Sequence, residues 1–247
     1  MHAASFGRGL RVLSVLTVLL LISAFSLVFF YAPNDADQGF VQKIFYVHVP
    51  LAIVALCGFV VGGVYGALYL WKGSRAHDLK SYVAIHQSII MGVGALITGS
   101  IWARASWGHW WVWDEPTLVS FLIVFLLFSC YWPLRFSIDD PERQARFAAV
   151  FAVIAGAFVP LNFLAVRLAE SYAPHPKVLM ATGGGMPAEM MNTFLLSLVA
   201  MALLFVTLWK YELASKHARM RLRSLKRRLA GDESLSPLGR SAAPQHL

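Results

Sequence analysis

The chain has 247 residues, of which 58% are apolar and 14% are charged, and its formal net charge is +8. A soluble domain carries about 45–50% apolar and about 25% charged residues, so this composition favours a membrane protein and excludes a disordered chain. The two cysteines, Cys57 and Cys130, lie in apolar runs without CxxC spacing. This excludes a disulfide framework, a thioredoxin-like redox pair and covalently attached c-type haem.

Six apolar runs are long enough to cross a bilayer as helices, since about 20 residues at about 1.5 Å each cover the hydrocarbon core. We place them at residues 11–32, 50–71, 82–101, 117–134, 147–167 and 189–209. The first run is longer than the apolar region of a signal peptide and lacks a small-residue cleavage pattern, so we keep it as a span. The predicted fold class is therefore an all-α polytopic membrane protein, a bundle of six transmembrane helices.

The distribution of Lys and Arg predicts the orientation of these spans. Of 21 such residues, all but four lie at the N-terminus, in the second and fourth connections and in the tail. The four on the opposite side are Lys43, Arg104, Arg167 and Lys177. Both termini are therefore predicted to be cytoplasmic, and the loops near residues 33–49, 102–116 and 168–188 are predicted to lie outside.

This topology divides the chain into a six-span membrane domain, residues 1–210, and a basic cytoplasmic tail, residues 211–247. We expect residues 216–228 to extend the last helix and to contact anionic lipid of the bilayer, and the Ser, Pro and Gly-rich end to be disordered. Because topology accounts for the basic charge, no nucleic-acid partner is expected. The cytoplasmic loops are short and contain no phosphate-binding GxxxxGK[ST] motif, so we expect no nucleotide hydrolysis by this chain.

Five of the eight tryptophans fall between residues 102 and 113. An aromatic belt at the membrane interface is the ordinary explanation, although a belt needs only one or two rings at each helix end. If residues 107–114 form a helix lying flat on the membrane, an arc of about 100° contains Trp107, Trp110, Trp111 and Asp114. Such an aromatic shelf, which ends in a carboxylate, suits a large flat apolar ligand. The spacing alone leaves shelf and belt both open.

Two histidines lie on the same predicted side as this loop. His48 directly precedes the second span, whose first turn we expect to contain Pro50, and His175 is held between two prolines. Neutral imidazole is a common axial ligand of haem iron, so together they favour a bis-histidine haem site, although each alone is more often structural. Zinc held by the same histidines and Asp114 would leave the tryptophans without a role.

His86 is the one histidine that we place inside a span, so the facing pair of an intramembrane b-type cytochrome is missing. An ionisable residue within a span is a functional candidate. Near the cytoplasmic end, however, a neutral histidine can hydrogen-bond a neighbouring helix. We therefore expect a structural hydrogen bond first, with a haem-entry or relay role as the alternative.

The string WGHWWVWD at residues 107–114 resembles the tryptophan-rich WGxxWxWD signature of the haem-handling proteins of cytochrome c biogenesis. With the chain length, the six spans and the Tyr-Val-His-Val-Pro segment at residues 46–50, it resembles the CcmC family of the cytochrome c maturation system. The resemblance implies that haem b is bound as cargo at the outer face of a bacterial inner membrane. It implies a haem platform of Trp107, Gly108, Trp110, Trp111, Trp113 and Asp114, with His48 and His175 as axial ligands of the iron.

The implied partners are a membrane-anchored periplasmic haem chaperone, CcmE, a small membrane protein, CcmD, and the CcmA–CcmB transporter. The sequence departs from the family pattern after Asp114, where Glu115 and Pro116 stand and the usual basic residue is missing. We therefore assign the contacts with the haem propionates to Lys43 and Arg104. The expected function is haem presentation rather than conventional enzyme catalysis. The alternatives are a permease-type subunit that exports haem or another substrate, and a scaffold whose aromatic loop only docks a partner.

Overall fold

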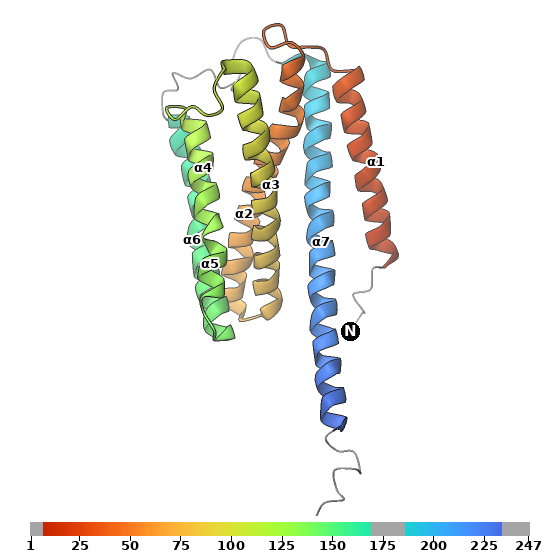
Figure 1. The fold of residues 1–247 in the computed structure, drawn as a ribbon, viewed down its shortest axis with the longest axis vertical. Coiled ribbons are helices and arrows are strands. Elements are labelled where there is room, and N and C mark those ends of the chain that lie inside the picture. The colour runs from red at the N-terminus through yellow and green to blue at the C-terminus, as the bar shows by residue number, and fades with distance from the viewer. Residues whose placement is uncertain (1–6, 169–185, 234–247) are drawn as a thin grey trace, which may run out of the picture.

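A computed structural model describes residues 7–168 and 186–233, and over these residues the chain is almost entirely helical (Figure 1). The elements are α1 (Arg8–Phe30), η1 (Phe40–Ile44), α2 (Phe45–Lys72), α3 (Arg75–Trp107), α4 (Pro116–Ser129), α5 (Tyr131–Phe136), α6 (Pro141–Leu168) and α7 (Ala188–Glu233). The described residues contain no strand, only an isolated bridge between Asp35 and Gly39. Six helices, with η1 joined to α2 and α4 joined to α5, are long and apolar enough to span a membrane. The predicted fold class is confirmed.

Two helices differ from the predicted spans in an informative way. The third helix is longer than predicted at both ends, because the polar stretch from Arg75 and the turn up to Trp107 are also helical. The fourth predicted span is divided at Cys130 into α4 and α5. Pro133 explains the division, since proline has no N–H to donate to the carbonyl oxygen four residues earlier.

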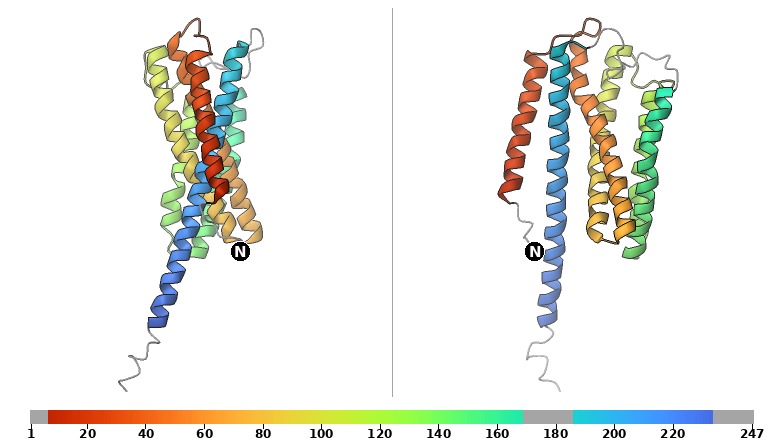
Figure 2. Two further views of the ribbon diagram at one scale, coloured as in Figure 1. Left: turned by 90° about the vertical axis from the view of Figure 1, so that its right-hand side faces the viewer. Right: turned by 180° about the vertical axis from the view of Figure 1, so that it is seen from behind.

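Successive spans run in alternating directions, with α4 and α5 together forming one span, so the molecule has two distinct ends (Figure 1). We call the end that carries η1 and residues 108–115 the loop end, and the end where α1 begins and α7 extends past the other helices the tail end. Helices α2 to α6 form one bundle, α7 packs along α2 and α3, and α1 packs on α7 at the edge (Figure 2). The α1–α7 contact includes a hydrogen bond of 2.7 Å between the hydroxyls of Thr17 and Thr207.

Small residues let α2 approach its neighbours closely. A Cβ atom built on Gly63 would lie 2.9 Å from the carbonyl oxygen of Ala152, and one built on Gly156 would lie 3.0 Å from the Cα of Gly63. The backbones of α2 and α6 therefore touch, which larger side chains at these positions would prevent. This contact fixes the bundle against which α3 is positioned.

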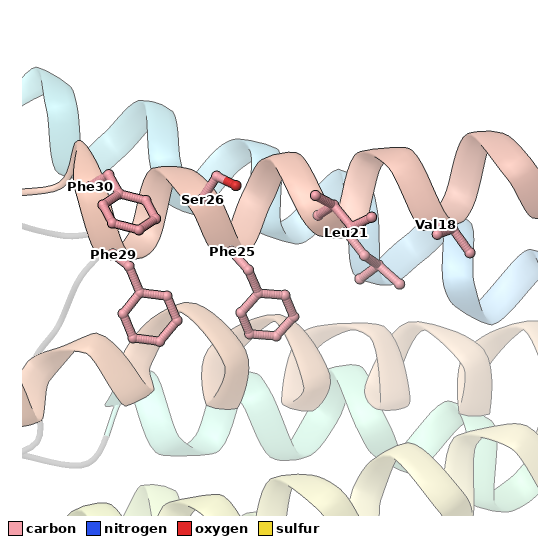
Figure 3. Close-up of a pocket in the computed structure, with 7 residues that line it drawn as sticks. Val18, Leu21, Phe25, Ser26, Phe29 and Phe30 are labelled. Atoms are coloured by element: carbon pink, nitrogen blue, oxygen red, sulfur yellow. The ribbon is translucent and has the colours of Figure 1, made fainter.

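One face of α1 has mainly apolar side chains, several of which are exposed (Figure 3). An open apolar depression on it is lined by Val18, Leu21, Ile22, Phe25, Ser26, Phe29 and Phe30. The serine is the one polar residue in this lining, and several of the rings are largely exposed, Phe30 at 90%. Such a face is suited to lipid chains, in agreement with the predicted bilayer.

Candidate functional site at the loop end

His48 is the fourth residue of α2, and its ring faces α3. Its Nδ1 lies 3.0 Å from the carbonyl oxygen of Ala95 and 3.2 Å from the hydroxyl oxygen of Thr98. A carbonyl oxygen only accepts, so Nδ1 carries the proton and the lone pair of the imidazole lies on Nε2. A hydrogen bond from one ring nitrogen that sets the other as the donor atom is typical of metal-ligating histidines.

The His48 ring is seated in a notch on α3. A Cβ atom built on Gly99 would lie 2.6 Å from Cε1 of the imidazole, so the missing side chain of the glycine makes room for the ring. Trp102, one turn further along α3, meets the imidazole edge to face at a centroid distance of 5.7 Å. Its indole N–H donates to Oε1 of Gln38 at 2.7 Å, which ties the first loop to the same helix. The direction of the imidazole is therefore fixed by α3 on two sides.

The helix start differs from the sequence prediction at Pro50. It is the sixth residue of α2 and buried, instead of standing in the first turn, because the 3-10 turn η1 leads directly into α2 at Phe45. His48 consequently lies inside the first turns of a helix, which holds its backbone more firmly than the predicted loop position would.

Residues 107–114 do not form the flat helix on which the aromatic-shelf hypothesis depended. Helix α3 ends at Trp107, and Gly108 follows it in a left-handed conformation with φ of 79°, which glycine adopts without strain. Helix α4 then starts at Pro116, with Glu115 as its N-cap. An irregular connection of eight residues, 108–115, remains between the two helices, so the arc calculated for a continuous helix does not apply.

Within this connection the indoles differ in exposure. The side chains of Trp110 and Trp113 are 60% and 73% exposed, whereas Trp111 is half-buried. Trp111 and Trp113 meet edge to face at a centroid distance of 5.9 Å. Among the described residues, the buried indole N–H of Trp111 has no hydrogen-bond partner. Trp102, by contrast, is buried in the helix packing, so it belongs to the support of the site and not to an exposed aromatic belt.

Glu115 is the side chain with which this chain departs from the family pattern, and it is only 1% exposed. Its Oε1 accepts from the backbone N–H of Thr117 at 3.3 Å, which caps the start of α4. Its Oε2 is buried and has no hydrogen-bond partner in the part of the chain that the structure describes. Asp114 beside it is exposed. Glu115 therefore serves to begin α4, and Asp114 is the carboxylate that the loop presents to its surroundings.

The two cations proposed for propionate contacts are placed differently. Lys43 is buried, and its ammonium donates to the carbonyl oxygens of Val28 at 2.8 Å and Ala32 at 2.5 Å, at the C-terminal end of α1. Arg104 is exposed one turn before the end of α3, and its guanidinium donates to the carbonyl oxygen of Gly108. The structure thus brings Arg104 to the tryptophan-rich loop and uses Lys43 to cap α1. His175 and Lys177 lie outside the described residues. The structure does not describe the side chain of Arg167 either.

At the tail end, His86 makes the hydrogen bond to a neighbouring helix that the sequence predicted. Its Nδ1 donates to Oε2 of Glu212 on α7 at 2.7 Å, and Gln87 donates to the same oxygen at 2.6 Å. Arg135, which we counted as a topology signal, is buried and forms two parallel bonds of 2.7 and 2.8 Å with the carboxylate of Asp78. Neither Glu212 as the partner of His86 nor Asp78 as the partner of Arg135 was predictable, because both contacts join residues far apart in the chain.

Several site residues were missed by sequence reasoning. The spacing predicted neither the Ala95 carbonyl as the partner of His48 nor the notch at Gly99. The available signal was the phase of α3: Ala95, Thr98, Gly99 and Trp102 recur every three or four residues and therefore share one face of the helix.

Comparison with known proteins identifies the family of the chain. The family model CcmC, described as Heme exporter protein C, matches residues 2–228. The chain belongs to the CcmC family. Heme exporter protein C of Paracoccus denitrificans is 31% identical over 197 residues, which cover 79% of this chain and 81% of that protein. The protein of the same name from Bradyrhizobium diazoefficiens is 32% identical over 196 residues, 78% of this chain and 73% of its own length. The Escherichia coli K12 protein is 29% identical over 162 residues, 63% of each chain.

Membership of the CcmC family, together with six helices able to span a membrane, gives the chain a haem-related role in cytochrome c maturation as a multi-pass membrane protein.

Proposed function

We propose that the chain binds haem b at the loop end and presents it to a haem chaperone of the CcmE type. The observation that carries the proposal is the seating of His48, whose Nδ1 is engaged by α3 while its ring stands beside Trp102, below the tryptophan-rich loop. An imidazole with a fixed tautomer and direction is prepared to bind iron without first losing rotamer entropy. In a member of the CcmC family, haem is the iron compound that this arrangement suits.

Each loop-end residue then has a definite task. His48 supplies one axial nitrogen through Nε2, and His175 supplies the other in the proposal. The exposed rings of Trp110 and Trp113 offer apolar area to a flat ligand, Trp111 meets Trp113 edge to face, and Gly108 shapes the turn. Trp107, the last residue of α3, completes the aromatic set in the proposal. Arg104 is the cation that meets a propionate, because the ammonium of Lys43 is occupied at the end of α1.

The proposal includes sidedness and partners. The loop end faces the outer, periplasmic side of a bacterial inner membrane, as the Lys and Arg distribution predicts. The exposed Asp114 and the two exposed indoles form the surface that the chaperone approaches. CcmD and the CcmA–CcmB transporter complete the assembly. Two neutral axial nitrogens hold haem without a covalent bond, so transfer requires only that the chaperone compete for one of them.

An absorption spectrum of the purified full-length chain in detergent tests the proposal. We expect a six-coordinate, low-spin haem spectrum that is lost or converted to high spin in His48→Ala and in His175→Ala. His109→Ala is the matched control, because His109 is an exposed histidine of the same loop, and its spectrum should equal that of the wild type. An unchanged low-spin spectrum in the His48→Ala/His175→Ala double variant contradicts the axial assignment.

The family description, Heme exporter protein C, also names export, and this keeps a permease-type role as the second candidate. Sealed vesicles containing the chain alone distinguish the two. Presentation predicts haem bound to protein without accumulation across the membrane, whereas a permease predicts vectorial movement that His48→Ala slows.

A further inference from the structure

His86 differs from an ordinary buried histidine in two respects. It lies within a helix long and apolar enough to span a membrane, and its side chain is still 28% exposed at the surface of the bundle. Keeping an ionisable group at such a position is costly, so a residue found there is a candidate for function. The hydrogen bond to Glu212 accounts for Nδ1 only. Among the described residues no hydrogen-bond partner is recorded for Nε2.

The bonding around Nδ1 follows a pattern known from metal sites. Oε2 of Glu212 is an acceptor, so the Nδ1 of His86 carries the proton and Nε2 carries the lone pair. A carboxylate behind an imidazole fixes the tautomer and the ring direction and raises the basicity of the opposite nitrogen. Gln87 holds the same carboxylate oxygen in place from the next position of α3. The result is an oriented imidazole whose Nε2 carries the lone pair.

Aromatic rings surround this imidazole from two helices. Tyr82 stacks on it at a centroid distance of 6.1 Å, and Trp132 of α5 lies at 5.2 Å. Phe136, which is 63% exposed, meets Tyr82 edge to face at 6.3 Å. The ammonium of Lys216 lies 4.6 Å from the centroid of the Tyr82 ring. We call His86, Tyr82, Trp132, Phe136 and Lys216 the tail-end patch.

We propose that the tail-end patch is a second haem-binding site, in which Nε2 of His86 ligates the iron of a haem that reaches the patch from the surrounding lipid. The exposed ring of Phe136 and the neighbouring aromatic side chains offer apolar area to the macrocycle, and Lys216, one turn beyond Glu212 toward the polar end of α7, meets a propionate. The identity of the cargo rests on the proposed function of the loop end. The site itself rests on the geometry of His86, Glu212 and the three rings.

Three observations favour haem over a purely structural tether between α3 and α7. A tether is complete once Nδ1 has bonded to Glu212, and it gives no reason for exposing the rest of the ring. The indole N–H of Trp132 is buried beside the imidazole and has no hydrogen-bond partner among the described residues, so a tether through hydrogen bonds does not explain why this indole is there. Finally, an oriented imidazole, flat rings and one cation match the three parts of haem, namely iron, macrocycle and propionates.

Haem titration of the full chain in lipid nanodiscs tests the proposal, with absorption spectra recorded for the ferrous protein. The wild type should bind two haems and His86→Gln one. The His48→Ala/His175→Ala variant should retain one haem, with the five-coordinate, high-spin, CO-binding spectrum of a single imidazole ligand. Gln at position 86 retains an N–H for Glu212, so the tether is kept and the iron ligand is removed. Glu212→Gln should weaken this second site by about 10–100-fold.

His77→Gln is the matched control, because His77 is also on α3 at the tail end, where it stacks on Tyr65 at 6.2 Å. It should bind two haems. The proposal is overturned if the His48→Ala/His175→Ala variant binds no haem, or if its remaining haem persists after His86→Gln is added. A loop-end spectrum that survives loss of both His48 and His175 would overturn the proposed function instead, so the two failures are distinguishable.

Discussion

The two histidine sites lie toward opposite ends of α3, the one helix that contributes to both. His48 lies beside Gly99 of α3, and the thirteen residues from Gly99 back to His86 correspond to about 20 Å along the helix axis. Both imidazoles bond through Nδ1 and both contact an indole, Trp102 at the loop end and Trp132 at the tail end. The two sites differ in the acceptor atoms that bond to Nδ1.

At the loop end the acceptors are neutral, a backbone carbonyl and a hydroxyl, and a notch in α3 closes around the ring. At the tail end the acceptor is a carboxylate, and the ring is open to the surface of the bundle. Shape therefore specifies the direction of His48, and charge specifies the direction of His86. A carboxylate also makes the more basic ligand. A histidine ring can therefore be oriented toward a ligand by shape or by charge, and substitutions can distinguish the two causes.

The largest expected effect comes from the charged support of the tail end. Arg135→Ala leaves the buried carboxylate of Asp78 without its partner and should destabilise the chain by about 3–5 kcal/mol. Thermal unfolding in detergent measures this loss, with the exposed Arg146→Ala as the control. Below the unfolding temperature the loop-end haem spectrum should persist. Equal stability of the two variants would show that the Asp78–Arg135 pair does not support the tail end.

Lys43→Met separates support from haem contact at the loop end. The variant loses two hydrogen bonds of a buried ammonium to the last turn of α1, and we expect a loss of about 2–3 kcal/mol in stability. Haem affinity should change by less than about twofold, which corresponds to under about 0.5 kcal/mol. Unfolding and haem titration together check this. A large loss of affinity at unchanged stability would restore Lys43 to the propionate contact expected from the sequence.

Gly99→Ala tests whether shape fixes His48. A methyl group at this position would lie 2.6 Å from Cε1, so the imidazole must move. Overpacking of this kind costs about 1–3 kcal/mol, and the low-spin spectrum of the loop end should shift or disappear while the tail-end haem is retained. Gly94→Ala on the same helix is the control, because its Cβ would meet only the flexible end of Leu51, at 3.3 Å. Identical spectra for both variants would argue against the notch.

We expect the smallest effect from Thr98→Val, which tests how much a neutral hydroxyl acceptor contributes at His48. It removes the hydroxyl from Nδ1 of His48 and leaves the Ala95 carbonyl, so haem affinity at the loop end should fall by about 2–5-fold, or about 0.5–1 kcal/mol. Haem titration of Thr98→Val beside Thr98→Ser and Glu212→Gln measures the difference. If Thr98→Val weakens its site as much as Glu212→Gln weakens the other, neutral and charged acceptors are equivalent here.

The spans were predictable because their signal is local and strong. A run of about 20 apolar residues has few alternatives to a membrane helix, and the hydrogen bonds of such a helix are satisfied within the segment itself. The same reasoning failed for residues 107–114, where the hydrophobic spacing suggested a helix. The conformation there is decided by Gly108, which ends α3, and by Glu115 and Pro116, which begin α4. Local stop and start signals outweighed the spacing.

The partners of the site residues were not predictable in the same way. Glu212 is 126 residues from His86, and Ala95 is 47 residues from His48. Such pairs depend on which helix faces lie together, and one sequence does not contain that information. The burial of Lys43 was not predictable for the same reason. The sequence places Lys43 on the loop-end side, and only the packing of η1 against α1 shows that its ammonium is buried.

Helix α7 reaches both histidine sites. Near one end Phe194 packs on Phe45, close to His48, and eighteen residues later Glu212 accepts from His86. Between these two positions α7 contains neither glycine nor proline, so it has no ready point at which to bend. A tilt of this stiff rod that lengthens the Glu212–His86 bond also displaces Phe194. α7 is therefore a rigid element that the surroundings of both histidines share.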